Sequence, residues 1–441
     1  MAPLKILLSA MDGQGHVNAV LGLAGILKQH NHELIFALSP AWESSIKSKG
    51  YQFIALKKDK VEEENKSENP FESLLNFLNQ QLEILRKEPM EALQQFDQQK
   101  LVSTYLGFTS DFMALDKPFE KVIEQIKPDL IIIDYVYRIP TLIKTKIPWI
   151  QLWSCNPIAV YKESCPPEGT GFSVYSPKEE WSEYRKLYSI KYAPLREMLN
   201  EFMINSGVEP YKEHESMALF ESPYLNIYNY PEALDYTDVA PRPDKWYRMD
   251  AVIREPDDKE PFKVPENLIN KPGKLIYFSL GSMGSVDLDL MKRVIGCLAK
   301  SPHRFIISKG PHHKQIDLPD NMWGDRYVNQ IGILPHVDLV ITHGGNNTFI
   351  ESLYFAKPMI IMPIWYDQRD NAQRMVDKQL GIRINTFNFT DDQLLDGIEK
   401  LINDEKLHER LTQISHDMRN TKTHDEISKL IEKTVLSSKN Q

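Results

Sequence analysis

Short apolar runs alternate with segments of helical periodicity along most of this 441-residue chain, and this alternation restricts the available folds more than any other feature. The runs occupy residues 5–11, 32–38, 129–134, 148–153, 274–280, 304–308, 337–342 and 358–363. They are apolar on both faces, as strands covered by helices on each side must be. Helical patterns lie between them, for example over 17–29 and 346–356. The alternation predicts βα units built around mostly parallel sheets.

The strand runs form two series, and a proline-rich stretch at about 240–273 separates them. Because prolines interrupt regular structure, this stretch favours an interdomain connection. We expect two doubly wound, Rossmann-like α/β domains facing each other across a cleft: an N-terminal domain over 1–253, a linker over 254–272 and a C-terminal domain over 273–415. An amphipathic helix within 416–441 is expected to pack back on the N-terminal domain. Open sheets of this kind bind ligands beyond the carboxyl ends of their strands.

The composition excludes several classes of protein. With 52 Lys and Arg residues against 61 Asp and Glu residues, the net charge of −9 argues against a general binder of nucleic acids or anionic membranes. A content of 42% hydrophobic and 26% charged residues excludes a disordered or fibrous chain. The cysteines, Cys155, Cys165 and Cys297, have spacings that favour a reducing compartment over a disulfide framework. No run suits a signal peptide or a membrane anchor, so we expect a cytoplasmic protein.

Two side chains at the ends of apolar runs are candidates for acid–base chemistry. His16 lies in the turn GQGHVN directly after the first run, and Asp134 closes the run DLIIID. Because the carboxyl ends of parallel strands share one sheet edge, these residues form a candidate pair of base and orienting carboxylate. The alternatives are that His16 only starts a helix and that Asp134 only caps one. The turn is not a dinucleotide fingerprint, because Asn18 stands at the third glycine position.

A second candidate site is the stretch over 340–368, which predicts a buried strand, a turn at Gly344 and Gly345, a helix and a second strand. Unpaired backbone N–H groups at the start of such a helix, together with its dipole, attract a phosphate. The loop FSLGSMGS repeats this device, and two such loops suit a diphosphate. The side chains that add donors are His343, Asn347, Thr348 and, from the second loop, Ser282. The alternative is a plain glycine turn without a ligand.

Residues 340–368 resemble the signature of the UDP-glycosyltransferase family in residue types and in spacing. The shared features are the core from Thr342 to Gly345, Glu351, Pro358, Pro363 and the pair Asp367 and Gln368. Upstream, YVNQIGILPHVDLVITH resembles the family's W-x-P-Q segment, with a spacing similar to that of the bacterial macrolide branch. His16 and Asp134 fall where the family keeps its catalytic pair. The resemblance implies the GT-B fold, and among animal members the soluble detoxification enzymes of spider mites are the most similar kind.

The resemblance also implies a role for each matching residue. It makes His16 the catalytic base and Asp134 its partner. For the UDP-sugar it assigns Tyr327 and Val328 to uracil, Gln330 and Glu351 to ribose, Ser282, His343, Gly345, Asn347 and Thr348 to the diphosphate, and Asp367 and Gln368 to the sugar hydroxyls. The chain departs from the family pattern where Tyr327 replaces a tryptophan and Asn329 a proline. Tyrosine still supplies a ring face for stacking.

These roles imply an inverting hexosyl transfer that gives a β-glycoside. The expected donor is a UDP-sugar, preferably UDP-glucose, with no other cofactor. No metal is expected, because adjacent His312 and His313 do not have a standard ligand spacing. An epimerase or phosphorylase and a non-catalytic protein that sequesters lipophilic compounds are the alternatives.

The expected acceptor is a small lipophilic molecule with a hydroxyl group, such as a flavonoid or another foreign compound. Its pocket is expected in the helical segments 60–125 and 165–215, where aromatic and methionine side chains gather. These residues are Phe71, Phe77, Met90, Met113, Phe172, Tyr175, Trp181, Tyr184 and Tyr188. Ordinary packing of helices on the N-terminal domain is the alternative explanation for them.

Overall fold

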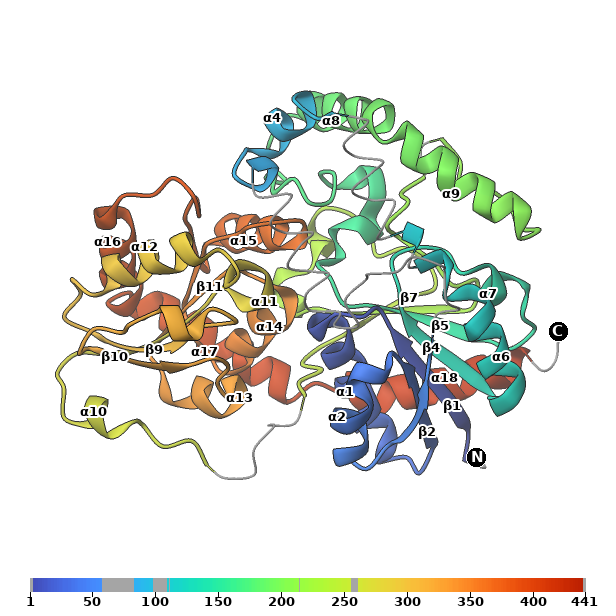
Figure 1. Ribbon diagram of the computed structural model, residues 1–441, viewed down its shortest axis with the longest axis horizontal. Coiled ribbons are helices and arrows are strands. Elements are labelled where there is room, and N and C mark those ends of the chain that lie inside the picture. Colours follow the sequence, from blue (N-terminus) through green and yellow to red (C-terminus); the bar gives the residue numbers. More distant parts are fainter. Residues whose placement is uncertain are drawn as a thin grey trace.

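The computed structural model describes residues 3–57, 83–97, 109–110, 112–213, 215–254 and 261–438. Within these ranges the chain forms two sheets of parallel strands, ordered β3-β2-β1-β4-β5-β6-β7 and β10-β9-β8-β11-β12-β13. Each sheet belongs to one domain, and the two domains lie side by side in Figure 1. The predicted architecture of two doubly wound α/β domains is confirmed.

Both faces of the N-terminal sheet are covered by helices. Its strands are β1 (Lys5–Ala10), β2 (Glu33–Leu38), β3 (Gln52–Ala55), β4 (Leu130–Asp134), β5 (Trp149–Trp153), β6 (Leu225–Asn229) and β7 (Trp246–Met249). Its helices are α1 (Gln14–Lys28), α2 (Glu43–Ser48), α4 (Pro89–Gln94), α6 (Asp116–Ile126), α7 (Pro140–Lys144), α8 (Lys178–Lys191) and α9 (Ala193–Asn205). Ile6 and Leu8 pack in the core that contains α1, whereas Leu7 packs in the opposite core with α6 and α9. This alternation explains why the first run is apolar throughout.

The C-terminal sheet has the same construction. Its strands are β8 (Leu275–Ser279), β9 (Arg304–Ser308), β10 (Met322–Asp325), β11 (Leu339–Thr342), β12 (Met359–Ile361) and β13 (Gly381–Arg383). Its helices are α10 (Glu266–Ile269), α11 (Gly281–Gly284), α12 (Leu288–Leu298), α13 (Gln330–Ile333), α14 (Asn346–Tyr354), α15 (Asp367–Asp377), α16 (Asp391–Ile402) and α17 (Glu405–Arg419). The sheet residues Ile276, Phe278 and Ile341 are fully buried in one core.

The structure adds strands that the apolar runs did not predict, namely β3, β6, β7, β10 and β13. Strand β7, Trp246–Met249, lies inside the proline-rich stretch but before the expected linker over 254–272, within the residues expected to form the N-terminal domain. Helices α4, α8 and α9 lie within the segments expected to be helical, and α6 extends one residue beyond the first of them. Two of the aromatic residues expected in the acceptor pocket, Phe71 and Phe77, lie outside the described residues.

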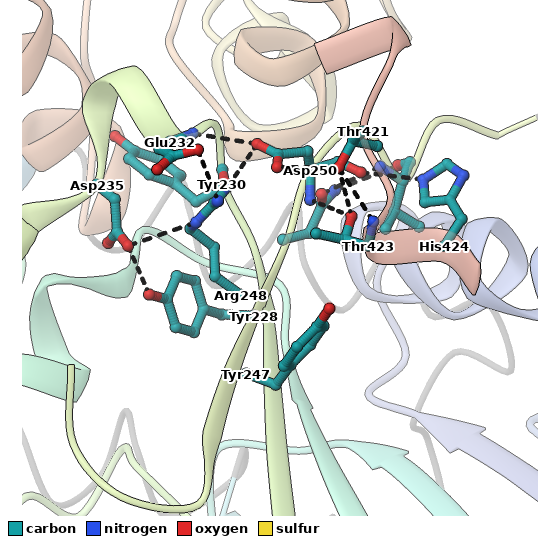
Figure 2. Close-up of polar contacts among 12 residues, drawn as sticks. Tyr228, Tyr230, Glu232, Asp235, Tyr247, Arg248, Asp250, Thr421, Thr423 and His424 are labelled. Atoms are coloured by element: carbon teal, nitrogen blue, oxygen red, sulfur yellow. Dashed lines mark hydrogen bonds and ion pairs between the residues drawn. The ribbon is translucent and has the colours of Figure 1, made fainter. Parts of the chain in front are cut away.

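The chain returns to the N-terminal domain through the last helix, α18 (Thr423–Ser438), which lies beside that domain in Figure 1. Ile427, Ile431 and Val435 of this helix are buried in the same core as α1. The crossing is fixed at Asp250, whose backbone N–H donates to Thr423 Oγ1 at 3.2 Å. The carboxylate of Asp250 also accepts hydrogen bonds from the Thr421 hydroxyl and from Arg248 (Figure 2).

Candidate active site

His16 and Asp134 meet at the carboxyl edge of the N-terminal sheet. Asp134 ends β4 beside Ala10, the last residue of β1, and His16 lies in the first turn of α1. The Nδ1 atom of His16 lies 2.9 Å from Asp134 Oδ2 and 3.1 Å from Ser154 Oγ. The next helix, α7, has Ile139 at its N-cap, so the alternative that Asp134 caps this helix is wrong.

Opposing effects determine the pKa of His16. Burial lowers it, but the charge of Asp134, the hydrogen bond to Asp134 and the charge of Asp367 together raise the pKa above its ordinary value of 6.5. Asp134 is 1% exposed, so its charge acts in a poorly solvated environment. Since Nδ1 is engaged and no residue of the described ranges hydrogen-bonds to Nε2, Nε2 is the atom that can take a proton from a ligand.

Two glycine loops lie against each other in the C-terminal domain. Strand β11 leads through His343 into α14, and β8 leads into α11, which contains Ser282. Gly281 has φ = +64°, and a Cβ atom there would lie only 2.4 Å from Cε1 of His343. The loop and the ring can therefore pack closely only because this residue is glycine. The structure brings Ser282 and His343 into neighbouring loops, next to the electropositive N-terminus of α14.

The pKa of His343 is shifted in the opposite direction to that of His16. Burial lowers the pKa of His343 to about 4, against a smaller opposing effect of a hydrogen bond with the Ser279 backbone. The ring is therefore neutral near pH 7, and it can donate one hydrogen bond without carrying a positive charge.

The first turn of α14 contacts the N-terminal domain beside His16 and Asp134. Asn347 Nδ2 donates to the backbone oxygen of Gly15 at 2.8 Å, and Asn346 Nδ2 donates to that of Ser154 at 2.8 Å. Gly15 precedes His16 in the chain, and Ser154 contacts the His16 ring. The glycine turn and the candidate base are thus held together across the domain boundary.

Gln330 and Glu351 also meet, as expected of residues that share a ligand. Gln330 Nε2 donates to the Glu351 carboxylate and, at 3.2 Å, to Thr348 Oγ1. Glu351 is 3% exposed and lies 3.4 Å from Nε of Arg254, a residue that the sequence analysis did not predict. No sequence signal pointed to Arg254, because it begins the charged run REPDDKE at the start of the expected linker, and such runs are common in linkers.

The residues expected to hold a base lie just before α13. Tyr327 is 53% exposed, and the guanidinium of Arg326 lies 5.4 Å from its ring centroid. Val328 follows it and is half-buried. The exposed ring of Tyr327 is suited to stack on a planar nucleobase, and the backbone of Val328 follows it close to Gln330 and Glu351.

Asp367 and Gln368 begin α15 but have different surroundings. Asp367 Oδ2 accepts a hydrogen bond from the Asn156 backbone N–H at 3.3 Å. Burial raises the pKa of Asp367 to about 6, while this hydrogen bond and the charge of His16 lower it. The side-chain amide oxygen of Gln368, Oε1, instead accepts hydrogen bonds from the backbone N–H groups of Ile364 and Trp365. In this arrangement the carboxylate faces the histidine site, while the Gln368 oxygen is engaged within its own loop.

Sequence analysis missed Ser154 and Asn156, although both follow β5 at the same sheet edge as Asp134. Applying the rule for carboxyl ends of parallel strands to this strand as well would have identified them. Asn156 Nδ2 donates to Asn371 Oδ1 at 2.8 Å, which ties the loop after β5 to α15.

In the described ranges, no group of three or more His, Cys, Asp or Glu side chains is arranged to hold a metal ion. His312 precedes a short 3₁₀ turn, His313–Gln315, and His313 begins it. Cys155, Cys165 and Cys297 are all free thiols. None of the described helices combines the length and the apolar character needed to cross a bilayer.

Comparison with known proteins finds one family that the C-terminal part of the chain resembles. Residues 254–428 match the family model described as UDP-glucoronosyl and UDP-glucosyl transferase. Human UDP-glucuronosyltransferase 1A1 is 26% identical over 233 residues, which are 52% of this chain and 42% of that protein. Human UDP-glucuronosyltransferase 1A9 is 30% identical over 155 residues, which are 34% of this chain and 29% of that protein. The chain therefore spans less than half the length of these relatives.

Solved structures share the whole fold. The glycotransferase of kitacinnamycin has a TM-score of 0.68 at 18% identity, covering 98% of this chain and 100% of its own. The glycosyltransferase VinC, solved in complex with DTDP, has a TM-score of 0.62 at 15% identity, with 98% and 100% coverage. At this identity the likeness establishes a common two-domain fold.

Proposed function

We propose that this chain is a member of the UDP-glycosyltransferase family, whose model matches residues 254–428, and that it transfers a sugar from a UDP-sugar to a hydroxyl group of a small acceptor. One observation carries the proposal. The pair of His16 and Asp134 lies directly beside the glycine turn of α14, joined to it by the hydrogen bond from Asn347 to Gly15. A proton acceptor and an anion site are thus adjacent, as a transfer from a nucleoside diphosphate requires.

The proposed reaction is an inverting displacement. His16 Nε2 accepts the proton of the acceptor hydroxyl, and Asp134 stabilises the resulting imidazolium through Nδ1. The acceptor oxygen forms a bond to the anomeric carbon as the bond from that carbon to the diphosphate oxygen breaks, and UDP leaves with the bonding electrons. An α-linked donor then gives a β-glycoside.

Charge develops on the departing diphosphate, and the second domain supplies its stabilisation. The N-terminus of α14 presents backbone N–H groups there, and Ser282, His343 and Thr348 add side-chain donors. Because His343 is neutral near pH 7, the helix dipole and neutral donors perform this task. The chemistry assigns no step to a metal ion.

For the donor, we propose that Tyr327 and Val328 hold uracil, Gln330 and Glu351 hold ribose, and Asp367 binds sugar hydroxyls. Gln368 can join through its amide Nε2, which faces Met283 Sδ at 3.7 Å. UDP-glucose is the preferred donor by the Asp–Gln pair, and UDP-glucuronate is the competitor that the names of the human relatives suggest.

For the acceptor, we propose a planar lipophilic molecule such as a flavonoid or another foreign compound, which would make the activity one of detoxification. Support comes from a row of stacked rings along α8. Tyr184 and Tyr188 have ring centroids 6.3 Å apart, Tyr188 and Tyr192 are 4.1 Å apart, and Phe96 continues the row at 5.3 Å from Tyr192. Such rings favour flat aromatic ligands.

The test is UDP release from UDP-glucose, UDP-galactose, UDP-GlcNAc and UDP-glucuronate, each with pooled flavonols, phenols and macrocyclic lactones. We expect acceptor-dependent release from one donor and its loss in His16→Ala. His30→Ala, an exposed histidine just after α1, is the matched control and should retain activity. Ligand binding without UDP release for any pair would instead support a sequestering protein. Release that persists in His16→Ala would refute the proposed base.

A further inference from the structure

Four cationic side chains and one carboxylate of the described ranges line a cavity of about 310 Å³ between the domains. Arg86, Lys87 and Glu88 come from the segment that leads into α4, and Arg369 and Arg383 come from α15 and β13. Figure 1 shows α4 and α15 on the same side of the molecule, where the domains adjoin. The volume lies at the lower end of the range for small-molecule sites.

The two arginines of the C-terminal domain donate hydrogen bonds only to neutral oxygens of the described residues. Arg369 Nη2 donates to two backbone carbonyls of segment 85–87, at 3.2 and 3.1 Å. Arg383 Nη1 donates to the Gly171 carbonyl and to Gln373 Oε1, both at 2.9 Å. Within the described ranges neither guanidinium forms an ion pair, so their charges face the cavity without a direct counter-ion.

The remaining charged groups do not balance the cavity. Arg86 pairs with Asp287 at 3.1 Å, whereas the Lys87 ammonium donates to the neutral amide of Gln95. Burial lowers the pKa of both buried arginines. The charges of Glu88 and Asp370, together with that of Asp377 for Arg383, only partly oppose this effect. Among the described lining residues, Lys87, Arg369 and Arg383 thus have no direct carboxylate partner, and Glu88 is the one carboxylate of the lining.

We propose that this cavity binds a small phosphate-bearing anion, either inorganic phosphate or a phosphate monoester. Guanidinium groups present planar N–H forks that match phosphate oxygens, and an anion would remove the unfavourable proximity of like charges. The ligand would contact residues 85–88 on one side and α15 and β13 on the other. It would therefore link the two domains at the helix that begins with Asp367. This site is separate from the transfer reaction proposed above.

The test is calorimetric titration of inorganic phosphate into the full chain at constant ionic strength, with saturating UDP occupying the diphosphate loops. Lys87→Gln should weaken phosphate binding and Glu88→Gln should tighten it, each about three- to tenfold for a unit charge some 6 Å away at an effective dielectric of about 40 to 80. Both residues lie in a partly exposed segment, so neither substitution should prevent folding. Lys292→Gln on the exposed face of α12 is the control and should have no effect.

Absence of phosphate binding to the wild type, or changes of the same sign in Lys87→Gln and Glu88→Gln, would overturn the proposal. So would loss of binding in Thr348→Ala but not in Arg383→Gln, because the phosphate would then occupy the diphosphate loops. A parallel titration with glycerol 3-phosphate separates the two sources: tighter binding identifies a monoester, and weaker or equal binding identifies free phosphate. Failure of the proposed transfer would appear separately, as absence of acceptor-dependent UDP release. If UDP itself does not bind, the phosphate titration is made without UDP.

Discussion

The contact between Asp134 and His16 gives the sharpest prediction of the proposed reaction. Asp134→Asn retains the size and position of the side chain but removes the buried charge that lies 2.9 Å from Nδ1. Ser154 still contacts the ring at 3.1 Å, so the imidazole keeps one partner. The substitution therefore tests the charge more than the position of the histidine.

The expected loss follows from the strength of this contact. A hydrogen bond to a charged group contributes about 1.5 to 3 kcal/mol, which corresponds to a decrease of about 10- to 150-fold in kcat/KM. His16→Ala removes the base itself and should decrease the rate by about 10²- to 10⁴-fold. Asp134→Asn is therefore expected to be impaired, but less than His16→Ala.

The dependence on pH provides a second, independent readout. A general base acts in its neutral form, so kcat/KM should rise with pH through the raised pKa of His16. Asp134→Asn removes the charge that raises this pKa, and the rising limb should move to lower pH. The ratio of variant to wild-type activity should consequently be smallest on the high-pH plateau and increase as the pH falls.

Asp129→Asn is the matched control, because Asp129 immediately precedes β4 at its opposite end and accepts the backbone N–H of Lys5 at 3.0 Å. It should leave the position of the limb unchanged. A limb that does not move in Asp134→Asn, or a loss as large as that of His16→Ala at every pH, would refute the assignment of the carboxylate.

Three further substitutions test other parts of the structure. Gly281→Ala places a Cβ atom 2.4 Å from the His343 ring at a residue with positive φ. Calorimetry should show that this substitution reduces the affinity for UDP about tenfold or more. The control is Gly296→Ala, which should leave the affinity unchanged because a Cβ atom there would have no neighbour within 4 Å. Ile431→Ala in α18 should lower the free energy of unfolding by about 2 to 5 kcal/mol in urea titrations, and Leu436→Ala, which is 51% exposed, by less than about 0.5. The pKa of His343 is lowered to about 4 in the folded chain. As the pH decreases below 6.5, the unfolded chain therefore binds a proton at this residue before the folded chain does, and the free energy of unfolding decreases. His343→Gln should reduce that fall between pH 6.5 and 4 by up to about 3 kcal/mol, measured by unfolding at each pH.

The sequence predicted the elements whose signal is local. Strands such as β1 and β4 are buried on both faces, and their apolar runs are visible without any knowledge of their neighbours. The rule for carboxyl ends of parallel strands then brought His16 to Asp134. The glycine turn before α14 was predictable for the same reason, since its conformation depends on its own residues.

Strand β6 shows where local signals fail. Its sequence LNIYN contains two asparagines, which reduce the apolar pattern, yet both are buried. Asn226 exchanges hydrogen bonds with the Ser222 backbone, and Asn229 does so with the Val252 backbone. The partners lie in loops outside the strand, so the burial of these residues cannot be predicted from the strand itself.

Helix α15, which contributes Asp367 to the candidate site, shows the same limit of local sequence signals. Its sequence DQRDNAQRMVD has only three apolar residues, at 372, 375 and 376, and suggests a helix with a narrow buried face, yet Asp370, Asn371 and Arg374 are also only 2%, 0% and 1% exposed. Asp370 accepts the backbone N–H groups of residues 169 and 171, and Arg374 donates to the backbone carbonyls of residues 234 and 235. All these partners belong to the N-terminal domain, so the buried polar surface of α15 exists only when the domains are in contact. Because α15 begins with Asp367, the domain contact that buries these charges also positions the Asp367 carboxylate beside His16 and Asp134. Separation of the domains would expose the charges of α15 and disassemble the site in the same movement.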